Sequence, residues 1–412
     1  MAGIAILGYG VVGSGVFEAL QANQAILKKK TGQSLDVKRV LDLKDFPGNP
    51  VEPHLTKNID EILNDPGINV VVETMGGLSP AYEYTRRALE AGKHAVTSNK
   101  ALVAKHGASL LKVSKSRHVS YLFEASVGGA IPIIRPLNQL LASEEVQSIS
   151  GILNGTTNFI LTQMEALGMS FDEALAHARE KGYAENDPSA DVDGWDAGRK
   201  LAILLSLSIG KHVDFLDIPT DGIRKIDKDD LKFAAAGGGC IKLMAIGEIR
   251  NGSVEAAIGP MVVAKGSLLS TVDDVYNSVM ITGNISDNIL FYGRGAGKFP
   301  TAGAVVADIV DALKNSNEHI AHDWSEEVVP VVSKGEISSA KQVRIAYSQD
   351  LDPKSATEEI FESELIWIDA GIPGQSAFIS PPMKEKELEL KLDCLETTGF
   401  EIKSALRIFT QR

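Results

Sequence analysis

The chain of 412 residues has few cysteines, few aromatic residues and no long apolar run. Its two cysteines, Cys240 and Cys394, are too few and too far apart for a CxxC metal site or a disulfide framework. No apolar stretch approaches the ~18 residues that a membrane span needs, and the apolar start of the chain lacks the basic residues of a secretory signal. These absences predict a cytoplasmic protein without a membrane segment or a cleaved leader.

An excess of positive charge is missing as well. The formal net charge is −13, and an acidic surface disfavours binding to nucleic acid or to anionic membranes. The remaining composition, with 44% hydrophobic and 23% charged residues, is that of a globular protein. Because the chain is too long for one ordinary core, we expect several domains and neither a nucleic-acid nor a membrane partner.

Strands and helices alternate over the first 130 residues. Short apolar strands are expected at 4–7, 36–41, 69–73, 95–97 and 120–123. Helices are expected between them at 14–30, 59–63, 81–91 and 105–115. This alternation is typical of a parallel sheet covered on both faces, so we predict an α/β, Rossmann-type dinucleotide-binding domain over residues 1–130.

The pattern changes over residues 131–315, which predict a second, α+β domain for catalysis and dimerisation. Helices are expected at 131–141, 159–167, 171–181 and 195–209, followed by strands at 242–249, 253–263 and 288–292. A last helix, ending near residue 313, is expected to return to the Rossmann domain. A polar linker then leads to a third, small domain over residues 336–412 with the order βαββαβ.

The motif Gly8-Tyr-Gly-Val-Val-Gly13 follows the first strand and opens a helix, as a dinucleotide-binding loop does. Gly8 allows a tight turn, Gly10 lets the backbone approach a pyrophosphate, and Gly13 lets helix and strand pack closely. The helix start, with Val11 and Val12, offers N–H groups to the phosphates. Since the context is right, a nucleotide site is favoured over an ordinary glycine turn.

The end of the second strand carries two charges of opposite sign. Asp42 would favour the ribose hydroxyl of NAD, whereas Lys44 would favour the 2′-phosphate of NADP. The sequence therefore predicts NAD or NADP without choosing between them.

Acidic residues and a lysine gather between residues 178 and 200. Asp196 and Lys200 are four residues apart at the start of a predicted helix and share a face, and Glu185 and Asp191 precede them in a loop. An ammonium beside carboxylates can hold or pass a proton, and the carboxylates can bind a substrate ammonium. An Asp and a Lys four residues apart on a helix more often form a surface ion pair. The acidic residues and the Gly/Pro turns that precede this pair favour a functional site instead.

This segment, from Ala178 to Lys200, resembles the signature of the homoserine dehydrogenase family at every fixed position. The resemblance implies reversible, NAD(P)H-dependent reduction of L-aspartate 4-semialdehyde to L-homoserine, in threonine and methionine biosynthesis. It implies that Lys200 is the acid/base and that Glu185, Asp196 and Asp191 line the substrate site. It extends over about residues 1–315, and no aspartokinase segment precedes the cofactor strand, so the monofunctional form is expected.

Other segments resemble the same family. They imply that Thr74, Ser98 and Gly297 contact the cofactor and that Lys100, with a catalytic role, lies between cofactor and substrate. The segment 124–131 resembles one that binds a structural sodium ion, mostly through main-chain carbonyls. Its implied ligands are Glu124, Val127, Gly129 and Ile131. By its residues alone, this segment is a strand-to-helix turn.

The third domain resembles an ACT domain, a module that senses amino acids. Its turn before the first helix, Asp350-Leu-Asp-Pro353-Lys354, lacks the glycine of the usual pattern, so a ligand would approach that backbone less easily. Threonine binding and a purely oligomeric role both stay open. A homodimer or homotetramer is expected.

Two other functions compete with the dehydrogenase. Cys240, in Gly237-Gly-Gly-Cys240, could be the nucleophile of an aldehyde-oxidising semialdehyde dehydrogenase, although no histidine base is near in sequence. The chain could also be an NAD(P) sensor without catalysis. The set of acids and Lys200 argues against a sensor, and turnover with homoserine separates the two.

Overall fold

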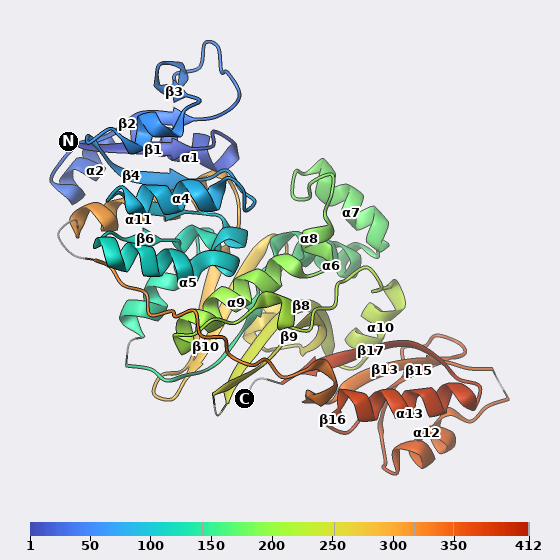
Figure 1. Ribbon diagram of the computed structural model, residues 1–412. Coiled ribbons are helices and arrows are strands. Elements are labelled where there is room, and N and C mark those ends of the chain that lie inside the picture. The colour runs from blue at the N-terminus through green and yellow to red at the C-terminus, as the bar shows by residue number, and fades with distance from the viewer. Residues whose placement is uncertain (142, 251, 316–318, 349, 411–412) are drawn as a thin grey trace. The chain divides into compact units, whose positions relative to one another are not determined.

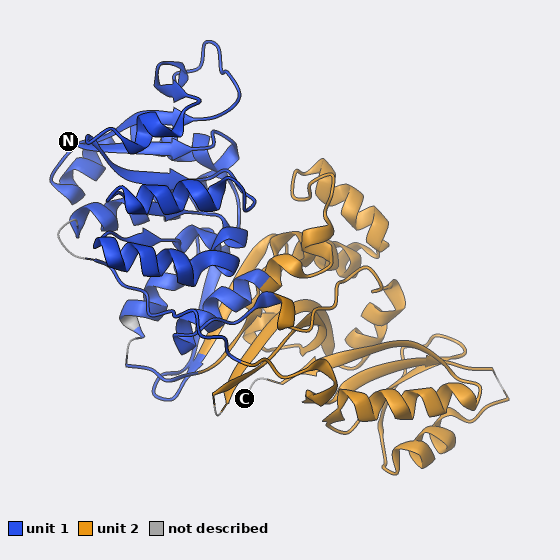
Figure 2. Ribbon diagram, viewed as in Figure 1, with its two compact units in different colours: residues 1–146, 199–215, 282–329 blue, residues 147–198, 216–281, 330–412 orange. Residues whose placement is uncertain are grey.

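The computed structural model describes the chain except for residues 142, 251, 316–318, 349 and 411–412 (Figure 1). Two compact units, each assembled from three segments, make up the fold (Figure 2). The first comprises Met1–Val146, Arg199–Phe215 and Thr282–Val329, and the second Gln147–Gly198, Leu216–Ile281 and Pro330–Arg412. The domain boundaries expected at 130, 315 and 336 remain predictions.

A six-stranded sheet with the order β3-β2-β1-β4-β5-β6 forms the centre of the first unit. Its strands are β1 (Ala2–Leu7), β2 (Leu35–Leu41), β3 (Leu55–Thr56), β4 (Ile68–Glu73), β5 (His94–Thr97) and β6 (Tyr121–Leu122). All neighbouring strands are parallel. The Rossmann-type sheet is thereby confirmed.

Helices cover both faces of this sheet. They are α1 (Val11–Ala22), α2 (Gln24–Thr31), α3 (Ile59–Leu63), α4 (Ala81–Glu90), α5 (Lys100–Arg117) and α11 (Lys298–Lys314). Side chains of α1, α2 and α11 share one core with the sheet, and those of α3 and α4 share a second. Helix α11 thus returns to the sheet that the start of the chain builds, as expected.

Two helices differ from the expectation. The helix expected at 14–30 is two helices, because the backbone of Asn23 leaves helical geometry, with φ −110° and ψ 20°. The helix expected at 131–141 is shorter and less regular: Ile134 and Arg135 are α-helical and lead into a π-helical turn, Pro136–Leu140. Pro132 and Pro136 lack the N–H that a regular helix needs, which explains the difference.

The second unit is built on strands in the order β10-β7-β8-β9-β17-β13-β15-β14. The first four are β7 (Val146–Ile152), β8 (Gly239–Arg250), β9 (Ser253–Ala264) and β10 (Tyr276–Gly283). The helices are α6 (Gly155–Leu167), α7 (Phe171–Glu180), α8 (Ser189–Val192), α10 (Lys228–Ala236) and the start of α9 (Trp195–Ile209), which continues into the first unit. Strand β11 (Asp287–Arg294) also belongs to the first unit. Strands β7 and β10 and helix α10 were not anticipated.

The C-terminal module, residues 336–412, shows the expected βαββαβ order. Its elements are β13 (Lys341–Ala346), α12 (Pro353–Phe361), β14 (Ile366–Ile368), β15 (Gln375–Ile379), α13 (Glu385–Thr397) and β17 (Glu401–Phe409). A short antiparallel pair, β12 (Ser338–Ser339) and β16 (Met383–Lys384), is added to it. Strand β17 pairs in parallel with β9 through Arg407–Phe409, which joins the module to the larger sheet. Its relation to ACT domains stays a prediction.

Candidate active site

The glycine-rich loop lies between β1 and α1, and each glycine meets a different constraint. Gly8 has a left-handed φ of +91°. A Cβ on Gly13 would lie 2.0 Å from the Gly8 carbonyl oxygen, so helix and loop touch there. Among the described residues, a Cβ on Gly10 would meet nothing within 4 Å, and no side chain caps α1. The loop therefore leaves open space in front of free helix N–H groups, which fits a pyrophosphate.

Asp42, directly after β2, is tied to this loop. Its carboxylate accepts hydrogen bonds from the Tyr9 N–H at 2.7 Å and from the Lys44 N–H at 2.9 Å. The Lys44 side chain, by contrast, is exposed. A fixed negative charge therefore borders the glycine loop at the position that faces an adenosine ribose in this fold.

The ends of β4 and β5 lie at the same edge of the sheet, because all its strands are parallel. Thr74 Oγ1 donates to the Leu7 and Gly8 carbonyls and so supports the glycine loop. Buried Glu73 accepts from Thr97 Oγ1 at 2.6 Å and from the backbone N–H groups of Met75 and Gly76. Burial raises the pKa of Glu73, and these hydrogen bonds oppose the rise.

Asn99 fixes the segment that carries Ser98 and Lys100. Its Oδ1 accepts from the Leu102 N–H and caps α5, and its Nδ2 donates to the Gly77 carbonyl at 2.6 Å. Ser98 and Lys100, on either side of it, are half-buried. Sequence reasoning missed Glu73 and Asn99, whose partners are too distant in sequence to form a local pattern.

Gly297 caps α11 with a φ of +121° and without a side-chain hydrogen bond. Helix α11 packs against α1, where a Cβ on Gly15 would lie 3.0 Å from the Lys298 carbonyl oxygen. The start of α11 is therefore close to the helix that opens the glycine loop, which is compatible with the expected cofactor contact.

The segment expected to hold sodium begins in a 3-10 turn, Glu124–Ser126. The Glu124 carboxylate accepts from the N–H groups of Ile133, Ile134 and Arg135, and its own N–H donates to Asp308. This side chain is thus used within the protein. No group of three or more His, Cys, Asp or Glu residues poised for a metal occurs among the described residues. A cation here would have to rely on main-chain oxygens, which hard cations accept.

In the second unit, one amide joins two of the expected acids. Asn154 Nδ2 donates to Asp191 Oδ1 at 2.7 Å and to Asp196 Oδ2 at 2.9 Å. Asn154 is also the N-cap of α6, because its Oδ1 accepts from the Thr157 N–H and Oγ1. Asn154 and Asp196 are buried. Two carboxylates held around one amide form a strongly negative site, suited to a cationic group.

Helix α9 places the lysine one turn further on. Asp196 and Lys200 are four residues apart on it, and both are buried. The helix starts after Gly194, whose φ is +86° and whose Cβ would lie 2.8 Å from Thr220 Cγ2, so a larger residue does not fit. Glu185 is exposed in the loop before α8. Sequence reasoning missed Asn154, which stands 37 and 42 residues from its two carboxylates.

Cys240 does not have the surroundings of a nucleophile. It is 5% exposed on β8, and its thiol faces the carbonyls of Val263 and Ser270 at 3.7 and 3.9 Å. Burial raises the pKa of the Cys240 thiol, whereas a reactive cysteine needs the thiolate. These surroundings argue against Cys240 as the nucleophile of an aldehyde-oxidising semialdehyde dehydrogenase.

Comparison with known proteins gives consistent matches. The family model "Homoserine dehydrogenase, NAD binding domain" matches residues 8–124, and "Homoserine dehydrogenase" matches residues 132–310. A homoserine dehydrogenase from Synechocystis sp. is 44% identical over 335 residues, which cover 78% of this chain and 76% of that protein.

Solved structures of homoserine dehydrogenases are similar to this chain over all or most of its length. The crystal structure of a homoserine dehydrogenase from Thiobacillus denitrificans has a TM-score of 0.90 at 30% identity and covers 100% of this chain and 99% of its own. A hyperthermophilic archaeal homoserine dehydrogenase in complex with NADPH has a TM-score of 0.62 at 26% identity and covers 76% of this chain and 97% of its own.

Proposed function

The chain belongs to the homoserine dehydrogenase family of NAD(P)-dependent oxidoreductases, and from this premise we propose how its residues divide the work. Lys200 is the acid/base, Asp191 and Asp196 hold the substrate ammonium with Glu185, and Lys100 acts beside the cofactor. The observation that carries this proposal is the amide of Asn154, which fixes two carboxylates on the segment that leads to Lys200.

The proton transfer is assigned to the lysine. A bound nicotinamide cofactor supplies the hydride that reaches the aldehyde carbon of L-aspartate 4-semialdehyde. The Lys200 ammonium gives its proton to the aldehyde oxygen as negative charge develops there, and the product is the hydroxyl of L-homoserine. In the reverse direction, the neutral amine takes the hydroxyl proton. The carboxylates keep the amino acid in place, so that the oxygen meets the lysine in a fixed orientation.

The cofactor is assigned to the glycine loop, with Gly8, Gly10 and Gly13 in the three roles of a dinucleotide-binding turn. Val11 and Val12 present N–H groups to the phosphates, and Thr74, Ser98 and Gly297 complete the contacts. Lys44 would meet a 2′-phosphate, but Asp42 is fixed by two hydrogen bonds beside the loop. We therefore propose NAD as the preferred cofactor, because a carboxylate repels a 2′-phosphate.

Further properties follow the same proposal. A sodium ion would be held by the carbonyl oxygens of Glu124, Val127, Gly129 and Ile131, since the Glu124 carboxylate is already engaged. The enzyme acts as a homodimer or homotetramer in the cytoplasm, in keeping with two free thiols. Within the described residues, no helix is long and apolar enough to cross a membrane.

Absorbance at the nicotinamide band tests the reaction directly. Purified protein with L-homoserine is expected to reduce NAD, and NADP more slowly. Reduction of NADP at the higher rate would contradict the role given to Asp42. If neither cofactor is reduced by a folded protein that binds both, the chain is a cofactor sensor instead.

A further inference from the structure

A cavity of about 210 Å³ lies inside the second unit, where the C-terminal module meets β9. We call it the junction cavity. Its walls are the loop 219–226, residues 257–261 of β9, residues 403–407 of β17, and the side chains of Lys334, Lys341 and Glu385. Pockets for organic ligands usually measure about 300–1,000 Å³. The volume therefore suits a small metabolite or an inorganic ion, and not a dinucleotide.

The lining of this cavity is basic in an acidic protein. Five cationic side chains face it, but only two carboxylates do, so that the formal charge of the lining is +3. The whole chain carries −13. The cations are Lys225, Lys334, Lys341, Lys403 and Arg407, and the carboxylates are Asp221 and Glu385. A concentration of one sign in a concave, partly enclosed site attracts ions of the other sign.

The two carboxylates of the lining do not satisfy all of these cations, although Lys403 is paired with Glu401 outside the lining. Lys334 Nζ lies 2.9 Å from Asp221 Oδ2. Glu385 is shared, because it is hydrogen-bonded to Lys341 and lies 3.6 Å from Arg407 Nη2. The Arg407 side chain is only 11% exposed. Among the described residues, its Nη1 has no hydrogen-bond partner, and neither has Glu385 Oε2, which lies 3.6 Å from Arg407 Nη2. An unsatisfied guanidinium donor is costly in a folded protein.

Repulsion among the cations also favours binding of an anion. Burial lowers the pKa of Lys341, and the nearby charges of Arg407 and Lys334 lower it further, against the opposing effect of Glu385. A ligand with negative charge and several acceptor oxygens would offset both the repulsion and the missing hydrogen bond.

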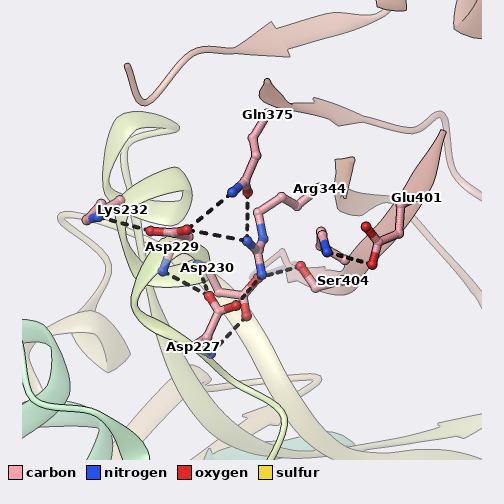
Figure 3. A network of polar contacts seen from close by, with 9 residues as sticks. Asp227, Asp229, Asp230, Lys232, Arg344, Gln375, Glu401 and Ser404 are labelled. Atoms are coloured by element: carbon pink, nitrogen blue, oxygen red, sulfur yellow. Dashed lines mark hydrogen bonds and ion pairs between the residues drawn. The ribbon is translucent and has the colours of Figure 1, made fainter. Parts of the chain in front are cut away.

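The C-terminal module also contacts α10 through buried polar groups, and these contacts help to preserve the cavity. Arg344 of β13 donates to Asp230 at 2.9 Å and to Asp227 at 2.6 Å, both at the start of α10 (Figure 3). Asp227 is the N-cap of α10, in a capping box with Asp230. Ser404 of β17 and Gln375 of β15 join the same network. The module is thus fixed against α10 by buried polar contacts.

We propose that the junction cavity binds a small oxyanion with at least two negative charges, of the phosphate or dicarboxylate class. Arg407 and Lys341 meet the oxygens from the module, and Lys225 meets them from the loop 219–226. This site is separate from the turn at residues 350–354, where a ligand of ACT type would bind.

The loop 219–226 links this cavity to the candidate active site. Its Ile223 N–H donates to the Val192 carbonyl at 2.9 Å, and its Arg224 forms an ion pair with Asp193. Val192 and Asp193 directly follow Asp191, one of the carboxylates held by Asn154. An oxyanion bound to Lys225 therefore acts on the segment that positions the substrate carboxylates, and its binding shifts the KM for L-homoserine.

Calorimetric titration of the full chain with inorganic phosphate and with succinate, at constant ionic strength set with chloride, tests the site without any turnover. We expect at least one of the two to bind, and the stronger binder identifies the ligand class. Arg407→Gln should weaken binding about tenfold or more, because charged hydrogen bonds are lost. Lys225→Gln, on the exposed side, should weaken it as well without disturbing the sheet. Lys354→Gln, an exposed lysine of α12 outside the cavity, should change nothing.

Steady-state kinetics then test the link to the active site. The bound oxyanion is expected to shift the KM for L-homoserine about fivefold or more in the unmodified chain, and not in the Lys225→Gln variant. Absence of binding to both probes, or binding equal in the unmodified chain and both cavity variants, would overturn the site. Binding without any shift in KM would overturn the link. Because binding is measured without substrate, the test of the site does not depend on the assigned reaction, whereas the test of the link rests on the proposed function.

Discussion

A single asparagine joins the parts of the proposed substrate site. Asn154 caps α6 with its oxygen and holds Asp191 and Asp196 with its nitrogen. Replacing it with alanine should raise the KM for L-homoserine about tenfold or more, since hydrogen bonds to charged groups contribute about 1.5–3 kcal/mol. Loss of the cap should also lower the free energy of unfolding by about 1 kcal/mol.

The control for this prediction is Asn58→Ala. Asn58 caps α3 in the same way, with its side chain accepting from the Asp60 N–H. It should show the loss of stability and an unchanged KM. If both variants have a normal KM, Asn154 is only a helix cap, and the two carboxylates do not depend on it.

We propose that Asp42 sets the preference between NAD and NADP. Asp42→Asn keeps an acceptor for the Tyr9 N–H but removes the charge. The ratio of kcat/KM for NADP to that for NAD should rise about tenfold, because like charges placed together cost up to several kcal/mol. Lys44→Gln is the counterpart. If it lowers the ratio while Asp42→Asn leaves it unchanged, Lys44 governs the choice.

The sequence offers the candidate residues of these sites, but not the residues that hold them in place. Gly8, Gly10 and Gly13 lie within one short motif, so their roles could be assigned from spacing. Asn154 could not be found in that way, because nothing local marks an amide whose two acids lie in another segment. Glu73 was missed for the same reason: a buried acid at a strand end is ordinary in sequence, and its partner Thr97 belongs to the next strand.

At the scale of elements, different glycines of the loop serve cofactor binding and helix packing. Gly10→Ala should leave the fold intact, because the new methyl group meets nothing within 4 Å and φ is −78°. It should weaken cofactor binding about tenfold or more, since the methyl group occupies the space for the pyrophosphate.

Gly13→Ala gives the contrasting result. Its methyl group would lie 2.0 Å from the Gly8 carbonyl oxygen, so β1 and α1 must separate. We expect a lower melting temperature for this variant and an unchanged one for Gly10→Ala, with cofactor affinity measured by fluorescence for both. Normal cofactor affinity in Gly10→Ala would contradict the role of the loop.

The hydrogen bonds from Arg344 to Asp227 and Asp230 attach the C-terminal module to α10, and substitution of Arg344 tests their contribution to stability. Arg344→Met leaves buried Asp230 without its guanidinium partner, which should lower the free energy of unfolding by about 3–5 kcal/mol. Lys232→Gln removes an exposed partner of Asp229 and should cost less than about 1 kcal/mol. Equal effects in chemical denaturation would show that the buried network does not hold the junction.

Element prediction succeeded where hydrophobic periodicity was strong and failed where other constraints dominated. Helix α9 has the bounds expected, because its apolar face is continuous from Trp195 to Ile209. Strand β10 was missed, since Asn277, Ser278 and Thr282 interrupt its apolar pattern, although the first two are buried. Helix α10 was missed despite its Asp227 capping box, a start signal that the sequence does contain.

At the scale of the whole molecule, three features combine in one chain. A parallel sheet carries the glycine loop, the second unit holds the carboxylates that we propose to bind the substrate, and helix α9 carries Lys200 four residues after Asp196. The family matches cover the segments that carry both the glycine loop and Lys200. Family membership gives the reaction, and the acid/base role of Lys200 is a proposal.

The turnover of Lys200→Ala with L-homoserine and NAD tests the acid/base role of Lys200. We expect a loss of roughly 10²–10⁴-fold in kcat, because an acid/base group is removed, with cofactor binding retained. Lys211→Ala, an exposed lysine paired with Glu327, should have normal turnover. Near-normal turnover in a correctly folded Lys200→Ala protein would contradict the account, and the proton would have to come from another group.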